Sequence, residues 1–147
     1  QTAEDGRSNI ITIGQQRFQV LEIVRSTPFY SAIVSWIDDE NTTSNLQELD
    51  TIRDSVVQAL NDVVNLTSKL TNSQKILPDK LPHNPMELSF WIGAHLGGPV
   101  SDEQQRLLEE RDTYVRLKRE YEMLDHTRKQ LAARTALKES FPDVKEN

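Results

Sequence analysis

The sequence contains no cysteine, and that absence alone excludes several kinds of chemistry. The chain forms no disulfide, binds no metal through thiolates and has no cysteine nucleophile. It also lacks an apolar run near the ~20 residues that a membrane-spanning helix requires. Basic residues are in the minority, 17 against 23 acidic ones, so the net charge is −6. This balance argues against a general binder of nucleic acid or of anionic membranes.

The common catalytic signatures are missing as well. The sequence has no G-x-x-x-x-G-K-[ST] loop, no G-x-G-x-x-G loop and no G-x-S-x-G turn. His83, His95 and His126 fall in three different predicted segments, and solvent or capping contacts explain them better than metal binding does. The acidic run Asp38–Glu40 is a conceivable cation site, but such a run is far more often a solvated loop. We therefore expect no catalytic residue, no cofactor and no metal.

The first forty residues have the composition of strands. In the middle segment, alternation places Phe18, Val20 and Glu22 on one face and the intervening residues on the other. A polar loop with turn residues then separates this region from the rest of the chain. Three strands are predicted, Asn9–Ile13, Gln16–Val24 and Phe29–Ile37.

From Ser44 onward the apolar period changes to that of helices. Residues at every seventh position form one stripe, which predicts a helix over about 44–73 with a capping box at Ser44 and Gln47. Asn84 and Pro85 are the start signal of a short apolar helix over about 85–96. The stripe of the first helix consists of Leu49, Val56, Val63 and Leu70.

A long third helix is predicted over about 101–140, opened by Ser101 with Gln104. Its stripe has two simple interpretations, the core of an antiparallel bundle or, beyond Leu124, an arm that grips a partner through residues such as Arg128 and Arg134. Its two heptad positions carry Leu107, Tyr114, Tyr121 and Arg128, and Glu110, Leu117, Leu124 and Leu131.

The organisation expected from these patterns is an α+β chain. A β subdomain over residues 1–43 precedes an antiparallel helical bundle with a long C-terminal helix over 44–141, and 142–147 form a tail. Because the first residue is Gln and no signal-like segment follows, we expect the chain to be part of a longer protein.

The strand region carries a recognisable motif. It consists of an Asp5-Gly6 turn, Gly14, an Arg17-Phe18-Gln19-Val20 corner, Pro28-Phe29 and a strand that ends in Asp38-Asp39-Glu40. This pattern resembles the closing strands of the Lon protease N-terminal, substrate-binding domain family. The helical segments Glu87–Leu96, Glu103–Leu124 and Leu131–Phe141 resemble that family's helical extension. The chain looks most similar to small stand-alone forms from cyanobacteria and plastids, without ATPase and protease domains.

The resemblance implies the second half of a PUA-like antiparallel β subdomain, because the family's earlier strands have no counterpart here. It implies a non-catalytic module that binds polypeptides or protein partners, for example by adding an extended peptide to an open sheet edge. The alternative is a structural or linker subunit fixed in a larger assembly, for which the resemblance suggests a plastid or photosynthetic one. The corresponding locations are the cytoplasm of a cyanobacterial-type cell and the chloroplast stroma or thylakoid periphery.

Aromatic and basic side chains are the candidates for partner binding. Arg17 orients the corner between strands through a carbonyl or carboxylate, or it contacts a peptide. Trp91, with Phe90 beside it, forms an exposed recognition patch or plugs the junction between strands and helices. The full candidate set is Arg17, Phe18, Phe29, Tyr30, Trp36, Trp91, Arg128 and Arg134.

Overall fold

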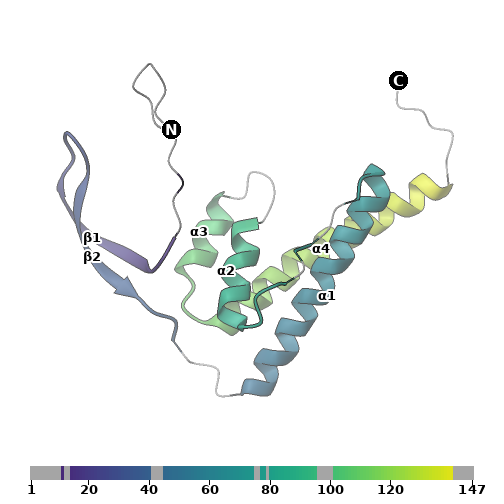
Figure 1. Ribbon diagram of the computed structural model, residues 1–147, viewed down its shortest axis with the longest axis horizontal. Helices are drawn as coiled ribbons and strands as arrows, with labels where there is room; N and C mark the ends of the chain where they lie inside the picture. Colours follow the sequence, from purple (N-terminus) through teal and green to yellow (C-terminus); the bar gives the residue numbers. More distant parts are fainter. Residues whose placement is uncertain are drawn as a thin grey trace. The chain divides into compact units, whose positions relative to one another are not determined.

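The computed structural model describes residues 11, 14–40, 45–74, 77–78, 80–95 and 101–140. It confirms the α+β class, since within these residues two strands precede four helices (Figure 1). The chain divides into two compact units, Gln1–Asp38 and Asp39–Asn147, so this division falls before the predicted subdomain boundary at residue 43. Of the strand predicted at Asn9–Ile13, only Ile11 is described, and it is not assigned to a strand.

The first unit contains an antiparallel hairpin made of β1 (Arg17–Arg25) and β2 (Ser31–Ile37). The pairing shifts between Val20 and Glu22 and again between Ile23 and Arg25. Each shift is a bulge, in which an extra residue on β1 has no opposite partner. The simple alternation predicted from sequence is therefore wrong, because Glu22 no longer shares a face with Phe18.

The second unit contains α1 (Leu46–Thr71), α2 (Pro85–His95), α3 (Ser101–Glu109) and α4 (Thr113–Ser140). The long helices α1 and α4 lie side by side (Figure 1). They run parallel, because their contacts advance together along both helices, from Asp62 with Arg128 to Leu70 with Lys138. The antiparallel pairing expected from sequence is wrong for these two helices, since α2, α3 and their connections return the chain before α4 begins.

Apolar side chains of α1, α2 and α4 form the core of this unit, as the stripes predicted. Val56 and Leu117 are fully buried, and Leu49, Val63 and Tyr121 pack against the buried cluster. The short α2 contributes two apolar side chains, Leu88 and Ile92, to this core, while its residues Met86, Glu87, Ala94 and His95 are exposed. The buried cluster consists of Val56, Ala59, Leu88, Ile92, Leu117 and Leu124.

The predicted third helix is two helices. After α3 ends at Glu109, Asp112 caps the start of α4, because its Oδ1 accepts from the backbone N–H groups of Tyr114 at 2.8 Å and Val115 at 3.2 Å. Glu110 Oε1 in turn accepts from the Asp112 N–H at 2.9 Å. The apolar stripe continues on both sides of this break, so periodicity alone could not reveal it.

Local capping differs in detail from the predicted pattern. Asn45 caps α1, its Oδ1 accepting from the Gln47 N–H at 3.1 Å, while Ser44 lies outside the described residues. The predicted cap of α2 is confirmed, since Asn84 Oδ1 accepts from the backbone N–H groups of Met86 at 2.9 Å and Glu87 at 3.2 Å. Gln104 donates its side-chain amide to the Gly93 carbonyl at 3.0 Å, so it joins α3 to α2.

Replacing Gly93 with Ala should raise the unfolding free energy by about 0.5–1 kcal/mol, because Ala loses less backbone freedom than Gly when a helix forms. An added Cβ would lie 3.6 Å from Glu120 Oε1 and 3.8 Å from Leu107 Cδ1, which are ordinary van der Waals distances. Urea unfolding of Gly93→Ala against the wild type measures the change. A lower stability would mean that α2 lies closer to its neighbours than the structure shows.

Candidate functional site

One face of the β1–β2 hairpin is entirely apolar. Unbulged β2 alternates, so Ala32, Val34 and Trp36 share a face. Paired residues on β1 point to the same side as their partners, and the bulge at Leu21 brings Ile23 to this side. We call Phe18, Val20, Ile23, Ala32, Val34 and Trp36 the apolar hairpin face.

The opposite face of the hairpin is mainly polar. Glu22 lies opposite Ile33 there, so the bulge keeps this carboxylate off the apolar hairpin face. A strand with strict alternation would have placed a charge among the apolar side chains. The polar face carries Arg17, Gln19, Glu22 and Arg25 on β1, and Ser31, Ile33, Ser35 and Ile37 on β2.

The apolar hairpin face is open to solvent in the described structure. Phe18 and Trp36 pair across the strands edge to face, with centroids 6.1 Å apart, yet they are 53% and 62% exposed. A two-stranded ribbon is at best marginally stable in water. A contiguous exposed apolar surface of this kind is typical of a binding surface.

Phe29 and Tyr30 lie between the two strands and are also exposed. The Arg25 guanidinium stands 4.2 Å from the centroid of the Phe29 ring, which is a cation–π contact. This contact covers one face of the Phe29 ring and places a positive charge beside the turn. Arg17 begins β1 opposite Ile37, on the polar face.

The acidic run after β2 is an anchor on the helical unit, so its prediction as a solvated loop is wrong at Asp39. The Asp39 side chain is 7% exposed, and its carboxylate binds the Arg116 guanidinium at 2.5 Å and the Thr113 hydroxyl at 2.5 Å. The next residue, Glu40, donates its backbone N–H to the Arg111 carbonyl at 2.8 Å and pairs with the Arg111 side chain at 2.9 Å.

Arg116 is the centre of this anchor and is fully buried. Its Nε donates to Ser89 Oγ on α2 at 2.7 Å, and its Nη1 donates to the Glu110 carbonyl at the α3–α4 break at 2.7 Å. The guanidinium also lies 4.0 Å from the centroid of the Phe90 ring. One side chain thus joins Asp39, α2 and the start of α4, which is a structural role rather than a catalytic one.

One turn further along α4, Glu120 is fully buried next to Gly93 and Leu107. Neither of its carboxylate oxygens has a hydrogen-bond partner among the described residues. Burial raises the pKa of Glu120 to about 8, while the nearby Arg116 charge acts in the opposite direction. The side chain is therefore protonated at neutral pH.

The described residues contain no group of three potential ligands around a metal position.

The family model of the ATP-dependent protease La (Lon) substrate-binding domain matches residues 1–126. The chain belongs to the Lon substrate-binding domain family. It is 28% identical over 125 residues to Lon protease 2 of Myxococcus xanthus and 27% identical over 125 residues to Lon protease of Anaeromyxobacter dehalogenans. Each match covers 85% of this chain but only 15% and 14% of the relative.

In this Lon-type chain, the predicted aromatic candidates fall into two groups. Phe18, Trp36, Phe29 and Tyr30 gather on the hairpin and are exposed. Trp91 instead packs against the helical core and stacks on His95, with ring centroids 4.2 Å apart. The four hairpin aromatics are thus neighbours on one element, whereas the Trp91 contacts among the described residues are internal to the helical unit.

The two basic candidates both lie on α4 of the Lon-type helical unit. Arg128 binds Asp62 on α1 at 3.3 Å and Asp125 on its own helix at 2.5 Å, and Arg134 is exposed. Hydrogen bonds from Lys129 and Arg128 lower the pKa of Asp125.

No helix among the described residues has the length and apolar character needed to span a bilayer.

Proposed function

We propose that this Lon-type chain is a non-catalytic recognition module that binds unfolded or extended polypeptide. The observation that carries the proposal is the apolar hairpin face, whose Phe18–Trp36 pair is more than half exposed. Membership of a substrate-binding domain family supports the same role. In this proposal residues 1–43 form the recognising subdomain, residues 44–141 the helical subdomain and 142–147 the tail.

A sheet edge and an apolar face suit an extended peptide for complementary reasons. Within the described residues each strand pairs with one neighbour, so its other edge offers backbone donors and acceptors. An added strand would gain main-chain hydrogen bonds there, and its alternate side chains would lie over the apolar hairpin face. Backbone pairing does not depend on sequence, whereas the aromatic pair favours apolar side chains.

Binding of fluorescein-labelled, reduced and carboxymethylated lactalbumin tests this proposal. We expect saturable binding in the micromolar range, because a two-stranded edge offers few backbone bonds. Replacing both Phe18 and Trp36 with Ser should weaken it at least tenfold, since burial of two aromatic side chains is lost. Fluorescence anisotropy on the full chain measures both affinities.

Ile33→Ser is the matched control, because Ile33 is 51% exposed but lies on the opposite face of the same hairpin. It should bind the labelled protein like the wild type. Absence of binding at tens of micromolar, or an equal loss in Ile33→Ser, would contradict recognition through the apolar hairpin face.

The same exposed face also favours a second role, that of a subunit fixed in a larger assembly. A two-stranded ribbon with an apolar face is more stable when a permanent partner covers it. Size-exclusion chromatography at low micromolar concentration separates the two roles. A monomer with protected hairpin amides and no co-purifying protein would argue against the fixed-subunit role.

A further inference from the structure

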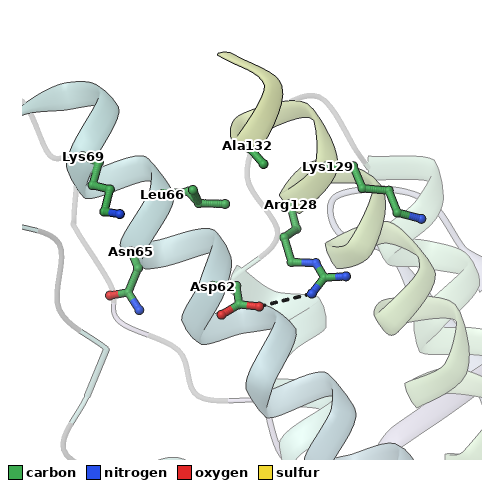
Figure 2. Close-up of a pocket in the computed structure, with 7 residues that line it drawn as sticks. All are labelled: Asp62, Asn65, Leu66, Lys69, Arg128, Lys129 and Ala132. Carbon is green, nitrogen blue, oxygen red and sulfur yellow. Dashed lines mark hydrogen bonds and ion pairs between the residues drawn. The ribbon is translucent and has the colours of Figure 1, made fainter. Parts of the chain in front are cut away.

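The parallel packing of α1 and α4 leaves a groove near their C-terminal halves. On the N-terminal side of the groove, buried side chains such as Val56 and Leu117 pack the two helices together. Further along, the small Ala132 faces the side of α1 that carries Leu66, and a cavity of about 500 Å³ opens between the helices (Figure 2). The groove is lined by Asp62, Asn65, Leu66, Lys69, Arg128, Lys129 and Ala132.

The charge of this groove is opposite to that of the chain. Three of its lining side chains, Lys69, Arg128 and Lys129, are cationic, and one, Asp62, is anionic, although the whole chain carries −6. Asp125, next to the groove, pairs with Lys129 at 2.7 Å and with Arg128. Even with both carboxylates counted, the groove keeps one positive charge in excess.

Two of these cations have capacity for a further anion. Lys69, in the last turn of α1, has no carboxylate partner among the described residues. Arg128 uses one N–H on Asp62 at 3.3 Å and one on Asp125 at 2.5 Å, out of the five that a guanidinium offers. The Arg128–Asp62 pair is long and more than a third exposed on both sides, and such pairs contribute little to stability. An incoming carboxylate can therefore replace Asp62 on Arg128 at low cost.

Figure 2 shows Leu66 pointing from α1 toward α4, where Ala132 lies one turn beyond Arg128, while the Arg128 guanidinium points to Asp62. The groove thus offers an apolar surface beside two cationic groups, and its volume suits a few side chains rather than a single ion. We propose that this groove binds an acidic segment of polypeptide, with one carboxylate on Arg128, a second on Lys69 and an apolar side chain over Leu66 and Ala132. Three cations on a chain of net charge −6 are too few for a nucleic-acid backbone.

This inference names the substrate class for a second surface and rests on the proposed function in one respect, that the occupant is a polypeptide. The probe is a fluorescein-labelled seven-residue peptide of alternating Glu and Leu, with a copy in which every Glu is Gln. We expect the Glu peptide to bind the full chain at least tenfold more tightly than the Gln copy. Its affinity should fall as salt rises, because exposed charges are screened.

Two groove variants locate the binding. Lys69→Gln removes an exposed cation without touching the core, and Arg128→Gln removes the central guanidinium. Each should weaken the Glu peptide at least fivefold. Lys118→Gln, an exposed position on α4 outside the lining set, is the matched control and should leave the affinity unchanged. Thermal unfolding of Arg128→Gln shows whether this variant remains folded. If Arg128→Gln is unfolded, the affinity of Lys69→Gln alone decides whether the groove binds the peptide.

Three results would overturn the inference: equal affinity for the Glu and Gln peptides, no loss in Lys69→Gln, or tighter binding to polyuridylate or to phosphatidylserine vesicles than to the Glu peptide. The hairpin variant Phe18→Ser/Trp36→Ser separates this inference from the proposed function. This variant should bind the unfolded lactalbumin more weakly than the wild type but bind the Glu peptide with unchanged affinity. If the wild type binds the Glu peptide but does not bind the unfolded lactalbumin, the hairpin proposal alone is contradicted.

Discussion

Replacing Arg116 with Met should lower the unfolding free energy by about 3–5 kcal/mol, because removing one partner of a buried ion pair leaves the other charge buried without its counter-charge. Asp39 is 7% exposed and would lose its guanidinium partner. Ser89 Oγ and the Glu110 carbonyl would lose their donors in the same step. Met keeps much of the volume and the contact with Phe90, so the loss reports on charge and hydrogen bonding rather than on a cavity. Chemical denaturation followed by far-ultraviolet circular dichroism measures it.

Arg119→Met is the matched control for this substitution. Arg119 lies on the same helix and also pairs with a carboxylate, that of Glu103, but its side chain is 43% exposed. Exposed ion pairs contribute about 0–1 kcal/mol, so this variant should stay close to the wild type. The double variant Arg116→Met/Asp39→Asn should lose less than the sum of the two single variants, because the second change removes the stranded charge. Equal losses for Arg116→Met and Arg119→Met would refute the anchor.

The Arg116 anchor also shows where sequence patterns stop being informative. The spacing of Val56, Leu117 and Leu124 predicted which faces of α1 and α4 are buried, because helix periodicity is a local property. Arg116 and Asp39 are far apart in the sequence, and each looks like an ordinary charged surface residue. Only the fold brings them within 2.5 Å. The acidic run was therefore predicted to be solvated for a sound local reason that tertiary pairing overrides.

The relative direction of α1 and α4 and the ends of the helices could not be predicted from periodicity, because they depend on the connecting segments, which have no periodic pattern. The stripes fixed neither the parallel course of α1 and α4 nor the break at Asp112, since a stripe has no direction and continued through the break. A local signal did exist for the break. Asp112 followed by Thr113 is a good helix start, because an Asp side chain accepts from the N–H groups of the next turn.

The hairpin shows the same limit at shorter range. Its two strands were predicted from β-branched and aromatic composition. The bulge at Leu21 was not, because no residue there has an unusual backbone preference. Yet the bulge decides which residues belong to the candidate site, since it exchanges Glu22 for Ile23 on the face that carries Phe18 and Trp36. A single inserted residue therefore makes that face uniformly apolar.

Glu120 should make the stability of the helical unit fall with rising pH. The folded state keeps the Glu120 proton up to its pKa of about 8, whereas the unfolded chain releases it near the ordinary value of 4.5. Between these values the unfolded state binds fewer protons, so each pH unit favours unfolding by at most about 1.4 kcal/mol. The stabilising effect of the neutral carboxyl is complete below pH 4.5, and it is lost once the pH has risen through about 8.

Glu120→Gln removes this titration while keeping the shape and a neutral side chain. Relative to the variant, the wild type should lose about 3–4 kcal/mol between pH 5 and pH 9, with no further change above that range. Urea unfolding at half-unit pH intervals measures the difference. Glu122→Gln, on the exposed side of the same helix, should track the wild type throughout. A pH-independent difference between Glu120→Gln and the wild type would show that the buried carboxyl does not hold its proton, because its charge would then be compensated inside the fold.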